Sequence, residues 1–593
     1  MKTLRCLLGM LGQRWRSWLA FEALFQLLSL SLVGPCLKLT VDAAMALNGY
    51  HYLTWENVKT FVVMPVSIIL IVLWAIVLAL SSVFNYAGLH YALTYGGQKE
   101  RVHLIDTVRY ALRRTWGALR PRNIVMVPYL VILLPLTNLG TSAGLVRAIN
   151  LPEFIMEYVE TNTVLGIAYI VVMLALSAVA LLYLFCNVFF VAQECSFGEA
   201  AREAREAGRH HFWIDTIRVL ILPSVPLLIL MIPLLLLLVL GVLASGDVAL
   251  WLAIFITLFM LVAVLISAPS AYACCLAMLR LRDVEPASPA KPEPSSNPAV
   301  VPVVSAVVLV ASLAGGAFFV AQNIISPLQT ADQLSGRKMQ LTAHRGGSFA
   351  APENTMAAFR KAKEGGADIC ELDVQQSSDG VIFVSHDSNF LRVSGVDKGA
   401  WELTWAQIQK LDATGEFWEG RVEPQGYPLL DEVVAWAAEN DMQLNIELKP
   451  TGHETNFEQA VVDIVNAHDF GTRCVVTSQT YDTVARVNEL NPDITCIYVT
   501  TLAYGAIWEL DAVDGYSIEA NSATAHFVSS LHKHDKRVFA WVVNSAEEMR
   551  KMGANGVDDL ITDDVPLGRE MVDEANSLTP GERLFFSLIA MFV

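Results

Sequence analysis

The hydrophobic pattern of the chain changes near residue 322. Before that point long apolar runs dominate, and from Met339 onward short apolar runs alternate with stretches of helical periodicity. A helix needs about 20 mostly apolar residues to cross a bilayer. Seven runs reach or approach that length: 21–38, 61–84, 124–140, 164–192, 218–244, 249–278 and 300–321. We therefore expect a helical membrane domain of about six spans over residues 1–282 and a seventh transmembrane helix at 300–321.

The segments around the seventh run differ in composition. Residues 283–299 (DVEPASPAKPEPSSNPA) contain five prolines and no periodicity, which is typical of a linker. Residues 322–338 are expected to connect the last span to a soluble domain at 339–576. The tail at 577–593 ends in an apolar stretch that is too short to span. It lies on the membrane, packs against the helices or forms a disordered terminus.

Basic residues are concentrated in alternate loops between the apolar runs. The stretch from Lys99 to Arg122 holds seven Lys and Arg, and the N-terminal segment, the loop after the fourth run and the linker after the sixth are also basic. Cytoplasmic loops carry such an excess. Seven spans then place residues 322–593 on the extracytoplasmic side of the cell membrane, whereas an eighth span would reverse this orientation.

Two of the basic loops look alike. RVHLIDTVRYALRRTWGALRP and SFGEAAREAREAGRHHFW both combine helical apolar spacing with basic residues. One interpretation is a pair of interfacial helices attracted to anionic lipid. The other is an internal repeat whose faces meet and form a lipid or substrate site.

The soluble part alternates predicted strands with predicted helices. Strands are expected at Gln340–His344, Ile369–Val374, Leu444–Leu448, Cys474–Thr477, Thr495–Val499, Gly515–Ile518, Val538–Val543 and Gly556–Thr562. Helices are expected at Asn354–Glu364, Leu430–Glu439, Phe457–Ala467, Tyr481–Leu490, Ala525–His534 and Ala546–Met552. Eight βα-like units favour a TIM barrel, (β/α)8, with a doubly wound sheet as the alternative. Residues 389–425 exceed a barrel loop and are expected to form a cap-like insertion, built either as a small satellite core or as a pocket wall.

Charge divides the chain in the same way as hydropathy. The net charge of −17 combines +5 for residues 1–338 with −22 for residues 339–593. An acidic domain argues against nucleic acid, which needs basic surface, but it tolerates metal cations. The nine cysteines form no CxxC pair, so they predict neither a disulfide framework nor a zinc site.

Carboxylates stand on alternate positions of two predicted strands. Glu371 and Asp373 flank Leu372, and Glu447 and Lys449 flank Leu448. Strand alternation puts each pair on one face. Carboxylates that lie so close to one another repel and need a cation between them. Hard oxygen ligands suit one divalent cation, Ca²⁺ or Mg²⁺. Lys449 is placed to hold a phosphate oxygen.

His344 and Arg345 end the first predicted strand, at the end where TIM barrels carry their chemistry. His344 and Arg345 precede two glycines, which let a phosphate approach the backbone, and Arg345 supplies a planar fork for phosphate oxygens. His386 ends the segment VIFVSH. Two histidines beside one cation allow one to take a proton and the other to donate one.

Four further residues have an ordinary structural interpretation beside a functional one. Glu353 and Asn354 lie at a predicted helix start and are also placed to orient the residues around the cation. Trp541 fits either the barrel core or the wall of a small pocket, and Asp563 ends the eighth strand as a loop cap or a supporting carboxylate.

These motifs together resemble the glycerophosphodiester phosphodiesterase family. HRG…PENT, ELDV…SSDG…SHD, YPLLDEV, IELK, AWVVN and GVDDLITD occur in the family's order between Met339 and Met571. The sequence departs from the family at Ser377-Ser378 and at Val542, positions to which no chemistry is assigned. The N-terminal half resembles the membrane domain fused to some bacterial members.

The resemblance implies a TIM barrel that cleaves glycerophosphodiesters to glycerol 3-phosphate and an alcohol. It implies metal ligation by Glu371, Asp373 and Glu447, acid–base roles for His344 and His386, and phosphate binding by Arg345 and Lys449. It further implies that a glycerol hydroxyl attacks phosphorus first and that water then opens the cyclic phosphate.

Other functions remain open from the sequence. A lysophospholipase D acting on lyso-lipids and a hydrolase of glycerol-phosphate polymers share the chemistry. A membrane lipid-binding receptor or transporter with a sensing barrel belongs to another class. The expected partners are the substrate and membrane lipids, without nucleic acid, and the sequence leaves the oligomeric state undefined.

Overall fold

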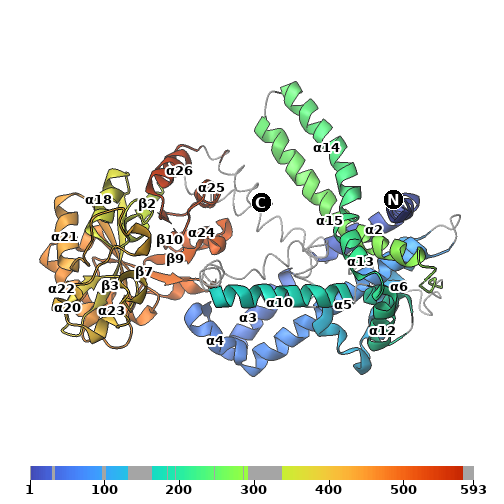
Figure 1. Cartoon of the computed structure of the whole chain (residues 1–593), viewed down its shortest axis with the longest axis horizontal. Coiled ribbons are helices and arrows are strands. Elements are labelled where there is room, and N and C mark those ends of the chain that lie inside the picture. The colour runs from blue at the N-terminus through green and yellow to red at the C-terminus, as the bar shows by residue number, and fades with distance from the viewer. Residues whose placement is uncertain are drawn as a thin grey trace. The chain divides into compact units, whose positions relative to one another are not determined.

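The chain divides into two compact units in a computed structural model (Figure 1). The structure describes residues 2–29, 34–96, 102–130, 163–182, 185–193, 195–245, 248–284, 286–290, 337–578 and 582. Apart from the last two residues, the helical unit comprises residues 1–47 and 63–320, and the barrel unit comprises 48–62 and 321–591. The barrel unit therefore includes a short segment from the N-terminal half.

The described part of the helical unit contains apolar helices and shorter amphipathic ones. They are α1 (Lys2–Gln13), α2 (Trp15–Leu28), α3 (Gly34–Asn48), α5 (Pro65–Thr94), α6 (Leu104–Ala118), η2 (Pro121–Asn123), α10 (Thr163–Leu182), α11 (Cys186–Ala192), α12 (Phe197–Gly208), α13 (Phe212–Ile221), α14 (Ser224–Ser245) and α15 (Val248–Arg280). Three stretches are long and apolar enough to cross a membrane: Pro65–Thr94, Phe212–Ala244 and Leu261–Arg280.

These three stretches overlap the expected spans 61–84, 218–244 and 249–278. The expected span 21–38 overlaps the end of α2 and the start of α3, and residues 30–33 between them lie outside the described residues, so this span stays a prediction. Most of 124–140, all of 300–321 and most of the linker, connector and tail segments lie outside the described residues, so these boundaries stay predictions.

The two similar basic loops both form helices. Ser196 and Glu199 make a capping box that starts α12. Tyr110 of α6 donates to the carbonyl oxygen of Val191 at 2.9 Å, and the amide of Phe197 donates to Asn123 at 3.0 Å. Both helices therefore pack into the helical unit through one face.

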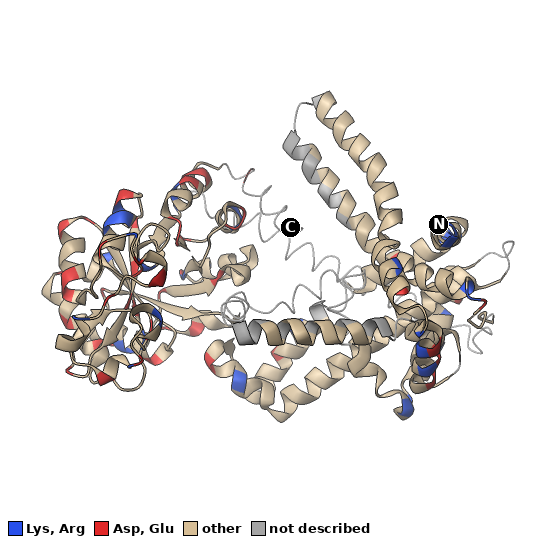
Figure 2. Cartoon of the chain, viewed as in Figure 1, with Lys and Arg blue, Asp and Glu red and all other residues tan. Residues whose placement is uncertain are grey.

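The barrel unit is built on eight parallel strands that close on themselves, so the predicted TIM barrel is confirmed and the doubly wound sheet is excluded. The strands, in spatial order, are β2 (Gln340–Ala343), β11 (Asp559–Thr562), β10 (Arg537–Trp541), β9 (Gly515–Glu519), β7 (Thr495–Thr500), β6 (Cys474–Ser478), β5 (Gln443–Leu448) and β3 (Ile369–Gln376), which pairs again with β2. The surrounding helices are α18 (Met356–Glu364), α21 (Leu430–Glu439), α22 (Phe457–Ala467), α23 (Tyr481–Leu490), α24 (Ala525–His532), α25 (Ala546–Asn555) and α26 (Val565–Ser577). Asp and Glu residues are spread over its helices and loops (Figure 2).

One of the eight βα repeats of the barrel lacks its helix. Between β7 and β9 the chain forms the short strand β8 (Ala503–Gly505) and a 3-10 turn η9 (Ile507–Glu509). Strand β1 (Tyr52–Thr54), followed by α4 (Trp55–Val63), pairs with β8 in antiparallel fashion. The predicted alternation of strands and helices is thus broken once, where a distant segment is added.

The core consists of two layers separated by the strands. Inside the barrel, Val475, Ile497, Phe539 and Ile561 pack together, while the opposite strand faces pack against the helices. The segment 389–425 carries α19 (Leu391–Ser394), η6 (Ala400–Glu402), α20 (Trp405–Ile408) and η7 (Glu416–Trp418). Phe390, Ile408 and Tyr427 belong to a separate small core there. This arrangement matches the satellite core, and Trp405 packs against it.

The buried carboxyl group of Asp559 is expected to make the stability of the barrel depend on pH. The side chain is fully buried, and burial raises its pKa from 3.8 to about 7, although the nearby Thr342 hydroxyl lowers it. Since the folded-state pKa is the higher one, stability is lost as the pH rises from about 4 through about 7. We expect Asp559→Asn to raise the free energy of unfolding at pH 8 by roughly 2–4 kcal/mol and to leave it nearly unchanged at pH 4.

Hydrogen exchange of β2 and β11 peptides in the full-length protein measures this effect. The exposed Asp535→Asn serves as the control. An equal gain at both pH values would contradict a titrating Asp559.

Candidate active site

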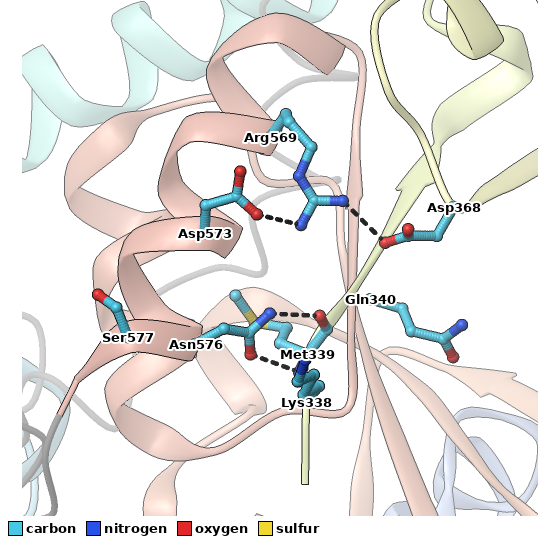
Figure 3. Close-up of a pocket in the computed structure, with 8 residues that line it drawn as sticks. All are labelled: Lys338, Met339, Gln340, Asp368, Arg569, Asp573, Asn576 and Ser577. Carbon is cyan, nitrogen blue, oxygen red and sulfur yellow. Dashed lines mark hydrogen bonds and ion pairs between the residues drawn. The ribbon is translucent and has the colours of Figure 1, made fainter.

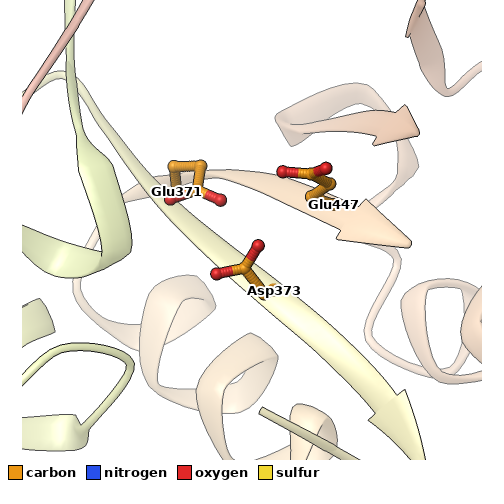
Figure 4. Close-up of side chains that lie close together, drawn as sticks. All are labelled: Glu371, Asp373 and Glu447. Carbon is orange, nitrogen blue, oxygen red and sulfur yellow. The ribbon is translucent and has the colours of Figure 1, made fainter. Parts of the chain in front are cut away.

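Three carboxylates converge at the carboxyl ends of β3 and β5 (Figure 4). Glu371 and Asp373 alternate on β3, and the parallel register sets Glu447 opposite Asp373. Ligand oxygens of the three residues lie within 4.8 Å of one another. Glu371 and Asp373 are only 3% and 1% exposed, so their repulsion is poorly screened by water.

Two cations border this triad. Lys449 Nζ lies 3.2 Å from Asp373 Oδ1 and 3.3 Å from Glu447 Oε1, and Arg345 Nε lies 3.7 Å from Asp373 Oδ2. Burial raises the pKa of Asp373, but the charges of Lys449, His386 and Arg345 outweigh it and hold that pKa below its ordinary value. Burial lowers the pKa of Lys449, but Asp373 and Glu447 outweigh it and raise that pKa.

Lys449 and Arg345 neutralise the charge of Glu371 less than that of the other two carboxylates. Burial, and then repulsion from Asp373 and Glu447, raises the pKa of Glu371 well above its usual range. Its Oε2 accepts the amide of Arg345 at 2.5 Å, whereas its buried Oε1 has no hydrogen-bond partner among the described residues. An orphaned carboxylate oxygen among three convergent carboxylates fits a hard divalent cation.

The backbone around the triad is held in unusual conformations. Arg345 and Asn354 adopt φ values of 51° and 56°, which are rare for residues other than glycine. Gly346 has φ 81°, and a Cβ there would lie 2.7 Å from Ala358 of helix α18. These conformations direct the backbone N–H of Arg345 at Glu371. They also direct the side-chain amide of Asn354 at Asp373 Oδ2, to which it donates at 2.8 Å.

His344 is oriented by a carboxylate at the end of β11. Its Nδ1 lies 2.9 Å from Asp563 Oδ1, and Asp563 also accepts bonds from Asn544 at 2.8 Å and Ser348 at 2.7 Å. Burial raises the pKa of Asp563, but these bonds and the His344 charge hold it below its ordinary value. An ionised carboxylate on Nδ1 fixes the ring and leaves Nε2 for a reacting group.

His386 has a matching arrangement. Its Nδ1 lies 2.7 Å from Asp387 Oδ1, and Arg392 Nε donates to Asp387 Oδ2 at 2.6 Å. Arg392 also binds Glu353, which pairs with Arg345 at 3.2 Å. A chain of alternating charges thus links the partner of His386 to an arginine beside the triad.

Trp541 ends β10 and packs against the apolar cluster inside the barrel. Its indole N–H is buried and has no hydrogen-bond partner among the described residues. A buried donor without a partner costs free energy unless a ligand or water accepts its bond, so Trp541 is a candidate pocket wall.

All eleven residues singled out in the sequence lie on β3, β5 and β10 or on the segments that follow β2, the short strand β4 (Ile382–Val384), β5 and β11. Sequence reasoning missed three residues that support them: Arg392, Asn544 and Ser348. The motif AWVVN contained a signal for Asn544, because a polar residue there follows a strand end. Arg392 and Ser348 carry no distinguishing pattern.

A cavity of about 630 Å³ lies at the other end of the barrel (Figure 3). It is lined by the start of β2 and by α26. Arg569 pairs there with Asp368 at 3.1 Å and Asp573 at 2.8 Å, and Asn576 bonds the backbone of Met339. Arg569 and the two aspartates are thus paired with one another, and the cavity lies at the end of the strands opposite to the triad.

Two family profiles match consecutive parts of the chain. The glycerophosphoryl diester phosphodiesterase family matches residues 344–567, and the membrane domain of glycerophosphoryl diester phosphodiesterase matches residues 5–324. The second match alone covers more than half of the chain and, together with the apolar helices, identifies a membrane protein.

Individual relatives match the barrel. Bacillus subtilis YhdW, named as a glycerophosphodiester phosphodiesterase, is 31% identical over 231 residues, which are 38% of this chain and 94% of the relative. A glycerophosphodiester phosphodiesterase of Caldanaerobacter subterraneus is 30% identical over 38% of this chain and 95% of the relative. A phosphodiesterase of Oleispira antarctica, solved with the product sn-glycerol-3-phosphate, is 26% identical with a TM-score of 0.37, over 41% of this chain and 99% of that chain.

The barrel, the carboxylate triad and both profile matches indicate the same family. The chain belongs to the glycerophosphodiester phosphodiesterase family, and it is a phosphoric diester hydrolase whose barrel is fused to the family's membrane domain.

Proposed function

We propose that the protein is a cation-dependent glycerophosphodiester phosphodiesterase of the cell membrane, which releases glycerol 3-phosphate and an alcohol in phospholipid and glycerol metabolism. The observation that carries this proposal is the carboxylate triad, two members of which are buried, with Arg345 and Lys449 at its edge. Deacylated phospholipids such as glycerophosphocholine have the matching chemistry: one negative phosphodiester beside glycerol hydroxyls.

Glu371, Asp373 and Glu447 would hold one Ca²⁺ or Mg²⁺. When bound, this cation polarises a phosphoryl oxygen and offsets the charge that develops on it. Arg345 and Lys449 lie beside the same carboxylates and donate to the remaining phosphate oxygens. Substrate binding gives Arg345 and Lys449 a new anionic partner, while the ion pair with Glu353 keeps Arg345 in place.

Proton transfer is assigned to the two histidines. One histidine takes a proton from the attacking glycerol hydroxyl, and the other donates a proton to the departing alcohol oxygen. The roles then reverse when water opens the cyclic phosphate. Support comes from the matched geometry, since carboxylates hold Nδ1 of both rings, Asp563 for His344 and Asp387 for His386.

The barrel is assigned to the extracytoplasmic side of a multi-pass membrane domain. The seven Lys and Arg between Lys99 and Arg122 support a cytoplasmic position for that stretch. Seven spans then carry residues 339–576 outside.

Glu371→Gln tests the metal assignment independently of turnover. Saturating Ca²⁺ or Mg²⁺ should stabilise the wild-type barrel by about 2.7 kcal/mol at a hundred times Kd. The variant should lose this increment, yet be at least as stable as the wild type in EDTA, because it removes a poorly compensated buried carboxylate. Exchange of β3 and β5 amides with and without cation is the measurement.

The exposed Glu423→Gln is the matched control and should retain the full increment. Equal stabilisation of wild type and Glu371→Gln would overturn the assignment of this ligand.

His344→Asn and His386→Asn test the acid–base assignment. Each should lower kcat for glycerophosphocholine by roughly a hundred- to ten-thousand-fold with a much smaller change in KM. Release of glycerol 3-phosphate by the full-length protein is the assay, and EDTA should abolish it.

His468→Ala is the control, because His468 pairs with Asp431 on the outer helices. Wild-type kcat in either histidine variant would remove that residue from the mechanism.

A further inference from the structure

Arg392 of the insertion 389–425 connects two loops at the catalytic end of the barrel. Its Nε donates to Asp387 Oδ2 at 2.6 Å, and its Nη2 donates to Asp387 Oδ1 at 3.2 Å. The same guanidinium donates from Nη2 to Glu353 Oε1 at 2.5 Å and from Nη1 to Glu353 Oε2 at 3.3 Å. Asp387 follows β4 and Glu353 follows β2, so one side chain holds both carboxylates in paired contacts.

Each of these carboxylates in turn contacts a residue of the proposed mechanism. Asp387 Oδ1 lies 2.7 Å from Nδ1 of His386, and Glu353 Oε1 accepts Nη1 of Arg345 at 3.2 Å. Burial raises the pKa of Asp387, but hydrogen bonds from His386 and Arg392 outweigh it and hold that pKa below its ordinary value. Burial also raises the pKa of Glu353, but Arg345 and Arg392 outweigh it and lower that pKa. Both carboxylates are therefore ionised at neutral pH and attract the guanidinium.

Stability alone does not explain this bridge. The Arg392 side chain is 52% exposed. Ion pairs with so much access to water contribute little to folding, because water screens them and ordering a long side chain costs entropy. The planar fork of an arginine nevertheless fixes the direction of each carboxylate that it binds with two nitrogens. Arg392 is therefore better suited to fixing the positions of two loops than to stabilising the fold.

Helix α19, which carries this arginine, is fixed at both ends by the small core around the insertion. Before it, Phe390 is 1% exposed and stacks on Phe383 of β4, with ring centroids 6.0 Å apart. At its end, Ser394 Oγ donates to the carbonyl oxygen of Asp412 at 2.6 Å and lies 2.8 Å from the Tyr427 hydroxyl. The packing of the insertion therefore determines where the guanidinium lies.

We propose that Arg392 is a positioning residue through which the insertion aligns His386 with Arg345 and thereby with the phosphate. This inference rests on the proposed function for the reaction that the alignment serves. A histidine exchanges a proton with a reacting oxygen only within hydrogen-bond reach of it, and Arg345 is one of the residues that set where the phosphate lies. Without the bridge both groups remain, but the distance between them is no longer fixed.

Arg392→Ala in the full-length protein tests the alignment. We expect kcat for glycerophosphocholine to fall roughly tenfold to a hundredfold with a much smaller change in KM, because a misplaced group slows the chemical step more than binding. Guanidinium ions at a non-denaturing concentration should restore part of the lost kcat, since the site is half exposed and admits a small cation. Arg392→Lys should give an intermediate kcat, because one ammonium group keeps the charge but cannot bind both carboxylates in pairs.

Arg486→Ala is the matched control. Its side chain is 53% exposed and pairs with Glu489 on α23 at 3.0 Å, so it resembles Arg392 in exposure and charge. This variant should keep the wild-type kcat with and without guanidinium. A wild-type kcat in Arg392→Ala would overturn the positioning role.

Amide hydrogen exchange measures the bridge without turnover. In Arg392→Ala, peptides from 350–356 and 384–388 should exchange about tenfold faster than in the wild type, because the contact between the two loops is lost. Guanidinium should slow this exchange again, and peptides from 400–427 should be unaffected. Equal acceleration across 400–427 would show that the insertion unfolds, and unchanged exchange in the two loops would show that nothing is held there. Either result would overturn the proposal.

The outcomes separate the two proposals. Faster exchange in both loops that guanidinium reverses, in a protein that hydrolyses no glycerophosphodiester, would sustain the bridge and refute the proposed function. Hydrolysis by the wild type with an unchanged kcat in Arg392→Ala would sustain the proposed function and refute the positioning role.

Discussion

Mutual repulsion between Glu371, Asp373 and Glu447 is the constraint around which the catalytic end of the barrel is organised. Strand alternation and parallel register bring the three carboxylates together, with Glu371 and Asp373 away from water. Lys449 and Arg345 compensate Asp373 and Glu447, but Glu371 keeps an oxygen without a partner among the described residues. A divalent cation would supply the missing partner, and the two basic residues beside the triad would then be available to a phosphate.

The surrounding loops maintain this arrangement at a cost in backbone strain. Arg345 and Asn354 adopt left-handed conformations, which are unfavourable for residues other than glycine. Each directs a hydrogen-bond donor at one member of the triad. Asp563 and Asp387 hold the histidines, and Arg392 links the second pair to Glu353. Strands set the positions of the charges, and short loops orient the two histidines.

Much of this was predictable from local pattern. Period-two alternation located Glu371, Asp373 and Glu447, and all eight predicted strands occur within a few residues of their expected ends. Sequence pattern did not reveal Arg392, because an arginine in a long insertion looks like any solvated charge. It did not reveal the missing barrel helix or its replacement by Tyr52–Thr54, since pairing across some 450 residues leaves no local periodicity.

Imaging the site directly is the most decisive measurement. Electron cryomicroscopy of the full-length protein with Ca²⁺ and glycerol 3-phosphate should reveal one ion bound by Glu371, Asp373 and Glu447, with the phosphate against Arg345 and Lys449. A phosphate bound elsewhere, or a triad that stays closed around Lys449 with no ion, would contradict the account.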